Sequence, residues 1–332
     1  MFLFYIIFDI IILKWVITLK KVVVIGGGHG LSVLLKGLKL FPVDITAIVT
    51  VADDGSSSGK LREEFDMPAV GDLRNVLVAL SEVEPLVEQL LQYRFKTDND
   101  FNNHPLGNLL LAALYNITGE LTDSLESLTK ILNIKGKVLP FTEDKAILVA
   151  HTSDGVIEGE SKITKAGKHI EYVEYKNEVR ATDEVITALE EADYIIFGLG
   201  SLYTSIIPNL LDKRVKETIK KSKAKKMYVC NAMTEHGETD GFKVSDCIKQ
   251  LEFYLGDNVI DVVVANNKYI DTDIQELYLT EKATPILIDK DNIKKLGVEL
   301  IEEPLVVINN NQVRHDPLKT ALAIFTYISS ED

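Results

Sequence analysis

Two glycine-rich loops, each directly behind an apolar strand, constrain the fold of this chain most. The first loop, residues 26–30, follows a β-branched run at 21–25, and the second, residues 53–59, follows another at 44–51. Leucines at helical spacing over 31–40 predict a helix between them. A strand, glycine-rich turn, helix and second strand are typical of a Rossmann-like unit that binds phosphate at the helix start.

The rest of the chain continues this alternation of strands and helices. It predicts an α/β fold with a Rossmann-like, doubly wound, mostly parallel sheet. A helical insertion is expected near 72–132, and a β-hairpin insertion near 158–177, where polar and apolar residues alternate around a glycine. The expected strands further along are 146–151, 194–197, 226–230, 259–265 and 305–308, and the expected helices are 72–81, 84–93, 106–115, 121–132, 206–221, 244–254 and 317–329.

Charge and cysteine content narrow the class of protein. The chain has 332 residues, 36 basic against 50 acidic, and a net charge of −14, which repels nucleic acid. Only two cysteines occur, so no disulfide framework is expected, in keeping with a reducing cytoplasm. We expect a cytoplasmic protein in which residues 20–332 form a single domain. This protein could assemble as a homo-oligomer.

The first 19 residues are the one unusual segment. They are almost wholly apolar and about as long as a membrane span, but Asp9 and Lys14 would each cost about 2.5–3.5 kcal/mol near a bilayer centre. A true start codon near Val16 or Leu19 explains this extension best. A packed extra helix and a membrane anchor are the alternatives, and we do not expect a membrane partner.

The first loop predicts an anion site and argues against a dinucleotide site, although an NAD-dependent oxidoreductase stays open as an alternative. The G-x-G-x-x-G pattern fails, because Leu31 and Val33 stand where its last glycine would be. The simpler alternative is a tight corner, which needs fewer glycines than are present, and His29 is equally consistent with solvent exposure. The candidate ligand-binding residues here are Gly26, Gly27, Gly28, His29 and Gly30.

The second loop carries more polar groups than a ribose contact needs. Its hydroxyls and N–H groups suit a phosphate or a sugar, and one carboxylate could hold a divalent cation such as Mg²⁺ brought by the phosphates. A solvated turn with an aspartate that caps a helix is the alternative. The candidates are Asp53, Asp54, Gly55, Ser57 and Ser58.

Four further segments add polar groups at expected helix starts or strand ends. In GDLRN, we expect Asp72 to cap a helix and Arg74 to favour an anion by forked hydrogen bonds. HPLGN, GLGSLYTS and NAMTEHGETDG likewise place polar groups where they could bind a ligand. The alternative is that these residues only cap helices, which would give the same sequence pattern. The candidates are Asp72, Arg74, Asn75, Asn108, Gly200, Ser201, Thr204, Ser205, Asn231 and Thr234. No Ser-His-Asp, His-Glu-x-x-His or Cys-x-x-Cys pattern stands out, so no catalytic or metal-binding residue is assigned.

Seven segments of the chain, taken in order, resemble the YvcK family of gluconeogenesis factors. They are GGGHGLSVLLKGL, TAIVTVADDGSSSG, PAVGDLRNVLVAL, HPLGNLLLAAL, GLGSLYTSIIPNLL, NAMTEHGETDG and RHDP. That family is similar to the CofD phospholactate transferases and shares their fold. The resemblance runs from about Lys21 to the C-terminus. His29 and Ser56 depart from the GGGTG and DGGSSG that the family usually carries, and residues 1–19 have no counterpart.

The resemblance implies a ligand and a role. It implies binding of a UDP-sugar, UDP-N-acetylglucosamine or UDP-glucose, and a part in cell shape and wall synthesis during gluconeogenic growth, with wall-synthesis or regulatory proteins as partners. It also links Tyr278 and Arg314 to the nucleotide-sugar, although by residue type alone both would be surface residues. A non-catalytic regulator is the expectation. The alternative is a CofD-like transferase that moves a phosphate-bearing group from a nucleotide donor to an acceptor.

Overall fold

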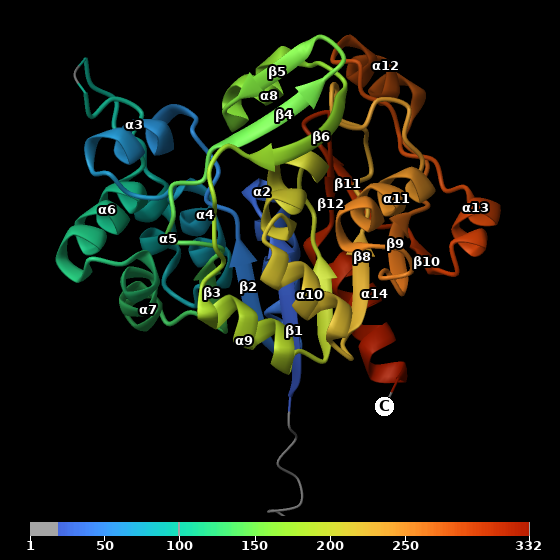
Figure 1. Cartoon of the computed structure of the whole chain (residues 1–332), viewed down its shortest axis with the longest axis horizontal. Coiled ribbons are helices and arrows are strands. Elements are labelled where there is room, and N and C mark those ends of the chain that lie inside the picture. Colours follow the sequence, from blue (N-terminus) through green and yellow to red (C-terminus); the bar gives the residue numbers. More distant parts are fainter. Residues whose placement is uncertain (1–18, 99, 332) are drawn as a thin grey trace, which may run out of the picture.

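A parallel β-sheet runs through the centre of the molecule in the computed structural model, which describes residues 19–98 and 100–331. The expectations for residues 1–18 lie outside these described residues. Within them, the central sheet has seven strands, all parallel, in the order β3-β2-β1-β7-β8-β9-β10 (Figure 1). The strands are β1 (Lys20–Gly26), β2 (Val43–Val49), β3 (Lys137–Pro140), β7 (Tyr194–Phe197), β8 (Lys225–Val229), β9 (Val262–Asn266) and β10 (Glu299–Glu303).

The sheet reverses its direction of growth beside β1. From β1 the chain moves outward through β2 to β3, then returns to the other side of β1 and moves outward again from β7 to β10. The two middle strands are buried on both faces, which is why they read as continuous apolar runs. This order confirms the doubly wound Rossmann-like fold and sets a topological switch point between β1 and β7, where such folds bind ligands.

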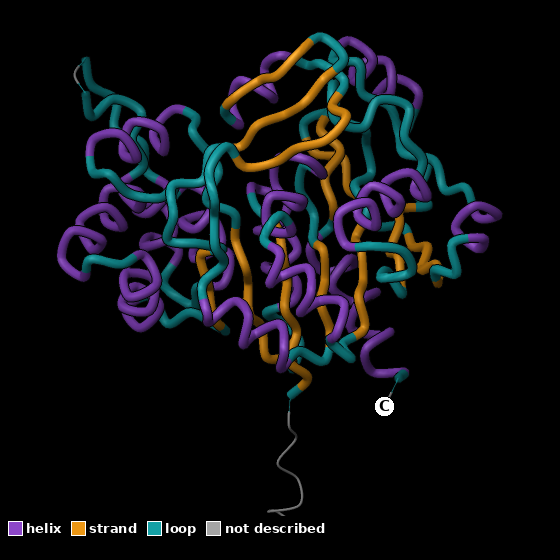
Figure 2. Tube along the Cα trace, in the orientation of Figure 1, coloured by secondary structure: helices purple, strands orange, loops and turns teal. Residues whose placement is uncertain are grey.

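Helices cover both faces of the sheet (Figures 1 and 2). The helix that follows the first glycine loop packs against the C-terminal helix and against α4, while α9, α10 and α11 lie on the opposite face. These helices are α2 (Gly28–Leu38), α4 (Gly71–Leu80), α9 (Asp183–Glu191), α10 (Lys213–Lys221), α11 (Val244–Leu255) and α14 (Pro317–Ser330).

The helical insertion is present where it was expected. It packs beside β2 and β3 through α4 and α7. Its further helices are α5 (Pro85–Gln92), α6 (Leu106–Thr118) and α7 (Leu121–Ile131), and α3 (Ser56–Glu64) comes before the insertion. The C-terminal part adds α12 (Thr272–Thr280), α13 (Lys290–Lys295) and the antiparallel pair β11 (Val306–Asn309) and β12 (Gln312–His315).

The expected hairpin over 158–177 is wrong in detail. The hairpin joins β4 (Leu148–Thr152) to β5 (Gly155–Glu158), and β6 (Ile170–Tyr175) pairs with the other side of β4. Between β5 and β6 lies α8 (Glu160–Ala166), which the alternating pattern hid. Helix α8 begins there because the carboxylate of Asp54, far away in sequence, accepts the Ser161 N–H at 2.8 Å and so caps the helix. We call β4, β5, β6 and α8 the roof, because they lie over the carboxyl ends of the central strands (Figure 1).

The single helix expected over 206–221 is also wrong. The segment forms a π-helical turn, η1 (Leu202–Ile206), then a 3₁₀ turn, η2 (Ile207–Leu210), and only then α10. Pro208 lacks the N–H that a continuous α-helix needs. Asp212 starts α10 anew by accepting the N–H of Val215 at 3.0 Å.

None of the helices in the described part of the chain is long and apolar enough to cross a membrane.

The contact between α2 and α14 predicts a stability change at Gly37. A β-carbon on Gly37 would lie 1.9 Å from the carbonyl oxygen of Pro317, which is backbone and cannot turn away. Gly37→Ala should therefore lower the free energy of unfolding by at least about 1 kcal/mol, although alanine is the better helix former. Urea denaturation measures this. Thr326→Ala on the exposed side of α14 is the control, and equal effects of the two changes would contradict the prediction.

Candidate functional site

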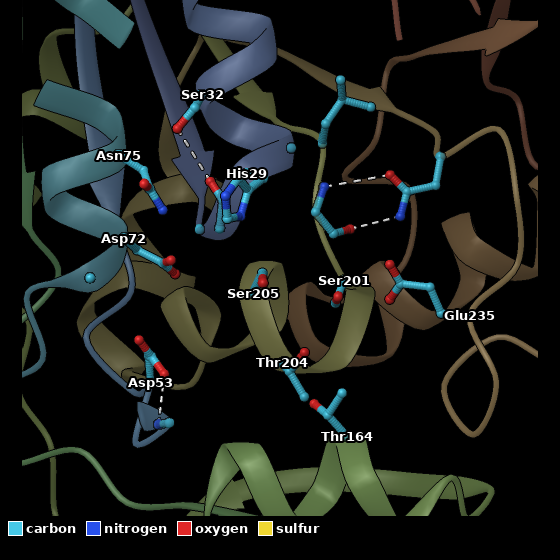
Figure 3. Close-up of a pocket in the computed structure, with 18 of the residues that line it drawn as sticks. His29, Ser32, Asp53, Asp72, Asn75, Thr164, Ser201, Thr204, Ser205 and Glu235 are labelled. Atoms are coloured by element: carbon cyan, nitrogen blue, oxygen red, sulfur yellow. Dashed lines mark hydrogen bonds between the residues drawn. The ribbon is translucent and has the colours of Figure 1, made fainter. Parts of the chain in front are cut away.

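A cavity of about 1030 Å³ lies at the carboxyl ends of the strands, around the switch point. Loops that follow β1, β2, β7 and β8 form its walls, and α8 of the roof closes one side (Figure 3). Its volume lies at the upper end of the roughly 300–1,000 Å³ common for small-molecule sites.

Nearly all the predicted site residues come together here. Those that line the cavity are Gly27, Gly28, His29, Gly30, Asp53, Gly55, Ser57, Ser58, Asp72, Arg74, Asn75, Asn108, Gly200, Ser201, Thr204, Ser205, Asn231, Thr234, Tyr278 and Arg314. Gly26 and Asp54 do not line it. The Gly26 carbonyl accepts hydrogen bonds from Thr50 and Asn209 inside the fold, and Asp54 is engaged with α8.

The first glycine loop brings backbone N–H groups to the cavity. Gly28 starts α2 with φ +65°, a left-handed conformation that glycine adopts without strain. A β-carbon on Gly30 would lie 2.7 Å from the backbone of Leu199 and Gly200, so the loops after β1 and β7 can approach this closely only with glycine there. The N–H groups at the start of α2 therefore face the switch point.

Two further helices begin at the same cavity. Helix α3 starts after Gly55 and α4 after Val70, and the N-cap residues of α2, α3 and α4 make no side-chain cap hydrogen bond. The expectation that Asp72 caps α4 is wrong, because the N-cap residue is Val70. Asp72 is the second residue of α4, and its carboxylate instead accepts the N–H of Gly28 at the start of α2. The backbone N–H groups of three helix starts form a region of positive potential suited to phosphate oxygens.

Ser56 occupies a strained position in the second loop. Its φ is +38°, in the left-handed region where a glycine pays no steric cost. A serine therefore holds this position at a cost in backbone energy that glycine would not have.

Arginines supply the positive side chains of the cavity. Arg74 is only 7% exposed, donates to Oδ1 of Asn75 at 2.6 Å, and has no partner for its Nε among the described residues. Burial, together with Arg94, lowers the pKa of Arg74 to about 10, so it stays charged at neutral pH. Burial and the nearby arginines, Arg74 and Arg314 foremost, also lower the pKa of His29, which is therefore neutral.

The loops after β7 and β8 form the opposite wall (Figure 3). The amide of Asn231 donates to the Gly200 carbonyl at 2.9 Å and accepts the Gly200 N–H at 3.5 Å. Buried Glu238 accepts the Tyr203 N–H and the Thr204 hydroxyl, both at 2.8 Å. The Thr204 hydroxyl is thus held by the protein, and Ser201 and Ser205 remain on the cavity wall.

Tyr278 and Arg314 reach the cavity from the C-terminal part of the chain. Tyr278 on α12 is half-buried, and its hydroxyl oxygen accepts the Val313 N–H at 2.8 Å. Arg314 on β12 is exposed and donates to Gln312 at 3.1 Å. By residue type alone both would be surface residues, and only the fold brings them to the cavity wall.

The cavity also holds carboxylates that the sequence did not single out, Glu160 from the roof and Glu235 after β8. Burial, and then the charge of Asp53, raise the pKa of both Asp72 and Glu160 to about 7. Burial likewise raises the pKa of Glu235. Among the described residues, no group of three or more acidic, histidine or cysteine side chains is placed to hold a metal ion.

Comparison with known proteins identifies the family. The profile of the 2-phospho-L-lactate transferase CofD family matches residues 22–306, which is most of the chain. The chain belongs to the CofD family. The predicted resemblance is confirmed, and the match spans the glycine loops, the roof and the loops after β7 and β8.

Relatives within the CofD family share the whole architecture. A gluconeogenesis factor from Halalkalibacterium halodurans is 48% identical over 307 residues, which cover 92% of this chain and 95% of that protein. The gluconeogenesis factor of Bacillus subtilis is 48% identical over 303 residues, 91% of this chain and 96% of that one. A crystal structure of a Bacillus halodurans protein superposes with a TM-score of 0.90 at 47% identity and covers 93% of this chain and 100% of that chain.

The raised pKa of Asp72 predicts a pH dependence of stability. The folded-state pKa of about 7 exceeds the unfolded value of about 3.9, so the folded protein binds this proton more tightly. The stabilisation that comes from protonated Asp72 is complete below about pH 4 and is lost as the pH rises to about 7. Asp72→Asn should make the free energy of unfolding of the ligand-free protein fall less between pH 5 and pH 7.5.

Urea denaturation at the two pH values measures this slope. Asp154→Asn is the control, because a hydrogen bond from Lys168 lowers the pKa of that exposed carboxyl. Equal slopes for Asp72→Asn and the wild type would show that Asp72 ionises freely in the folded protein.

Proposed function

We propose that this chain binds a UDP-sugar, UDP-N-acetylglucosamine or UDP-glucose, as a non-catalytic gluconeogenesis factor that relates wall-precursor supply to cell shape. The observation that carries the proposal is the meeting of three helix starts with buried Arg74 in one cavity. The curated relatives are named gluconeogenesis factors.

A diphosphate suits the end of the cavity near β1 and β2. Its oxygens accept hydrogen bonds only, and the N–H groups of α2, α3 and α4 are donors only. Arg74 adds a planar guanidinium with an unpartnered Nε, which favours forked contacts to phosphate. A ligand without acceptor oxygens at this end would leave these donors unpaired at a cost of roughly 1–3 kcal/mol each.

The far walls of the cavity suit the two groups that flank a diphosphate. Ser201 and Ser205 offer hydroxyls of the kind that pair with sugar or base edges. Asn231 and Thr234 shape the same wall while they are bonded to Gly200 and Thr284. Tyr278 offers a ring face for stacking, and Arg314 a charge for a phosphate. We infer that wall-synthesis or regulatory proteins read the bound state, and that the protein needs no catalytic base for this role.

The second candidate function is a transferase of the CofD kind, favoured by the family profile over residues 22–306. In that case Asp53, beside the second loop, would hold a Mg²⁺ brought with the phosphates of a nucleotide donor. Release of nucleoside monophosphate from a nucleotide donor, dependent on Mg²⁺ and an acceptor, would favour this function over the regulator.

Ligand binding should stabilise the protein. UDP-N-acetylglucosamine at 100 times its dissociation constant should add about 2.7 kcal/mol to the free energy of unfolding. Thermal melting with UDP-N-acetylglucosamine, UDP-glucose and NAD measures the shift. Melting temperatures raised by NAD and unchanged by both UDP-sugars would contradict the proposal.

Arg314→Ala should weaken UDP-sugar binding while the fold survives. Loss of charge-assisted bonds to a phosphate should cost about 1.5–3 kcal/mol of binding free energy. Isothermal titration calorimetry measures it, with Arg180→Ala as the control, because Arg180 is exposed and pairs with Glu178 away from the cavity. Equal affinity of the two variants would remove Arg314 from the site.

A further inference from the structure

A buried chain of three polar side chains stands behind the anion end of the cavity. Ser57 Oγ lies 2.8 Å from Nδ1 of His104 and accepts a hydrogen bond from Nδ2 of Asn108 at 3.1 Å. The three side chains are 6%, 6% and 2% exposed. They come from α3, the loop before α6, and α6, so the sequence alone does not bring them together.

Only two of the three reach the cavity. Ser57 and Asn108 line it, whereas His104 packs behind Ser57. Asn108 Oδ1 is buried and has no partner among the described residues, which marks this corner as incomplete without a bound group.

The geometry fixes what the Ser57 hydroxyl can offer. A hydroxyl has one proton to donate and two lone pairs that accept. Asn108 occupies one lone pair. When Nδ1 of His104 carries its proton, it occupies the second, and the Ser57 proton is then left to point into the cavity.

We propose that His104 is a positioning residue that turns Ser57 into a hydrogen-bond donor for a phosphate oxygen. The inference rests on the proposed nucleotide-sugar ligand, whose phosphate oxygens only accept hydrogen bonds. Without ligand, the neutral ring can instead accept the Ser57 proton, so the ligand selects the tautomer with the proton on Nδ1.

The surroundings of His104 agree with a neutral ring. Burial lowers its pKa, and the cations Lys60 on α3 and Arg94 before the loop act in the same direction, opposed by Asp100 in the loop. His104 therefore works by the direction of its hydrogen bond and not by its charge.

A double-mutant cycle tests the coupling. Ser57→Ala and His104→Leu should each weaken UDP-N-acetylglucosamine roughly tenfold or more in calorimetry, and the double variant should bind no more weakly than Ser57→Ala alone. His104→Asn should retain most of the affinity, because its amide can donate from near the position of Nδ1. His104→Leu affinity within twofold of the wild type, or losses that multiply in the double variant, would overturn the proposal.

Controls separate this role from folding and from the proposed function. His151→Leu, at a histidine paired with Glu174 in the roof, should leave affinity unchanged. If wild-type protein binds no UDP-sugar, the proposed function fails, and the same cycle is then run with inorganic pyrophosphate as the probe.

The wild-type protein gives a second test that needs no stable variant. Nitrogen-15 imidazole resonances, assigned with His104→Asn, should show the proton of His104 on Nδ1 when ligand is bound. A proton on Nε2 alone in the bound state would overturn the proposal.

Discussion

The close approach of the chain segments that follow β1 and β7 is the constraint on which the cavity depends. Asn209, buried in η2, donates to the Gly26 carbonyl at 3.2 Å and to the Ser205 carbonyl at 2.9 Å, and so ties the end of β1 to the π-helical turn. Gly30 allows the two loops to touch, and Asn231 extends the link to the loop after β8. Three neighbouring strand ends are thereby held as one rigid rim, which is the preorganisation that a polar ligand needs.

The cavity carries opposing charges at a cost to the folded state. Arg74 is buried without a full set of partners, while Asp72 and Glu160 are held where burial and Asp53 disfavour their ionised forms. Ser56, in the second glycine loop, adds backbone strain. Such unfavourable features collect where structure is shaped for binding rather than for stability, and the apolar core under the sheet offsets them.

The sequence predicted the parts of the fold whose signals are local. Strands β1, β2 and β7 are largely buried and read as apolar runs rich in β-branched and aromatic residues, and a glycine-rich loop comes soon after each of the first two. Strand β3 is only four residues long and ends in proline, and β10 is an edge strand rich in glutamate, so neither carried a recognisable pattern. Helix α8 was missed because its cap comes from Asp54, more than a hundred residues earlier.

In the site, too, the sequence predicted local features and missed contacts between distant residues. The backbone N–H donors of the glycine loops were predictable, because several glycines directly after an apolar strand are typical of a loop that binds an anion. Contacts between distant side chains were not. Ser57 and His104 are 47 residues apart, and Glu160 reaches the cavity only because the roof folds over it. Asp72 was assigned the wrong role, since a carboxylate one residue inside a helix start looks like a cap until the neighbouring loop is seen.

The packing of α14 on α2 has a consequence for the order in which the protein is completed during synthesis. The helix that carries the first glycine loop leaves the ribosome early, but Gly37 on that helix is covered by Pro317 and Ala321 near the end of the chain. The face of α2 that α14 covers therefore stays exposed to water until residues 317–330 have been synthesised. The anion loop, although made first, gains its final support last, so a nascent chain would reach its binding-competent form only once the C-terminal helix has emerged.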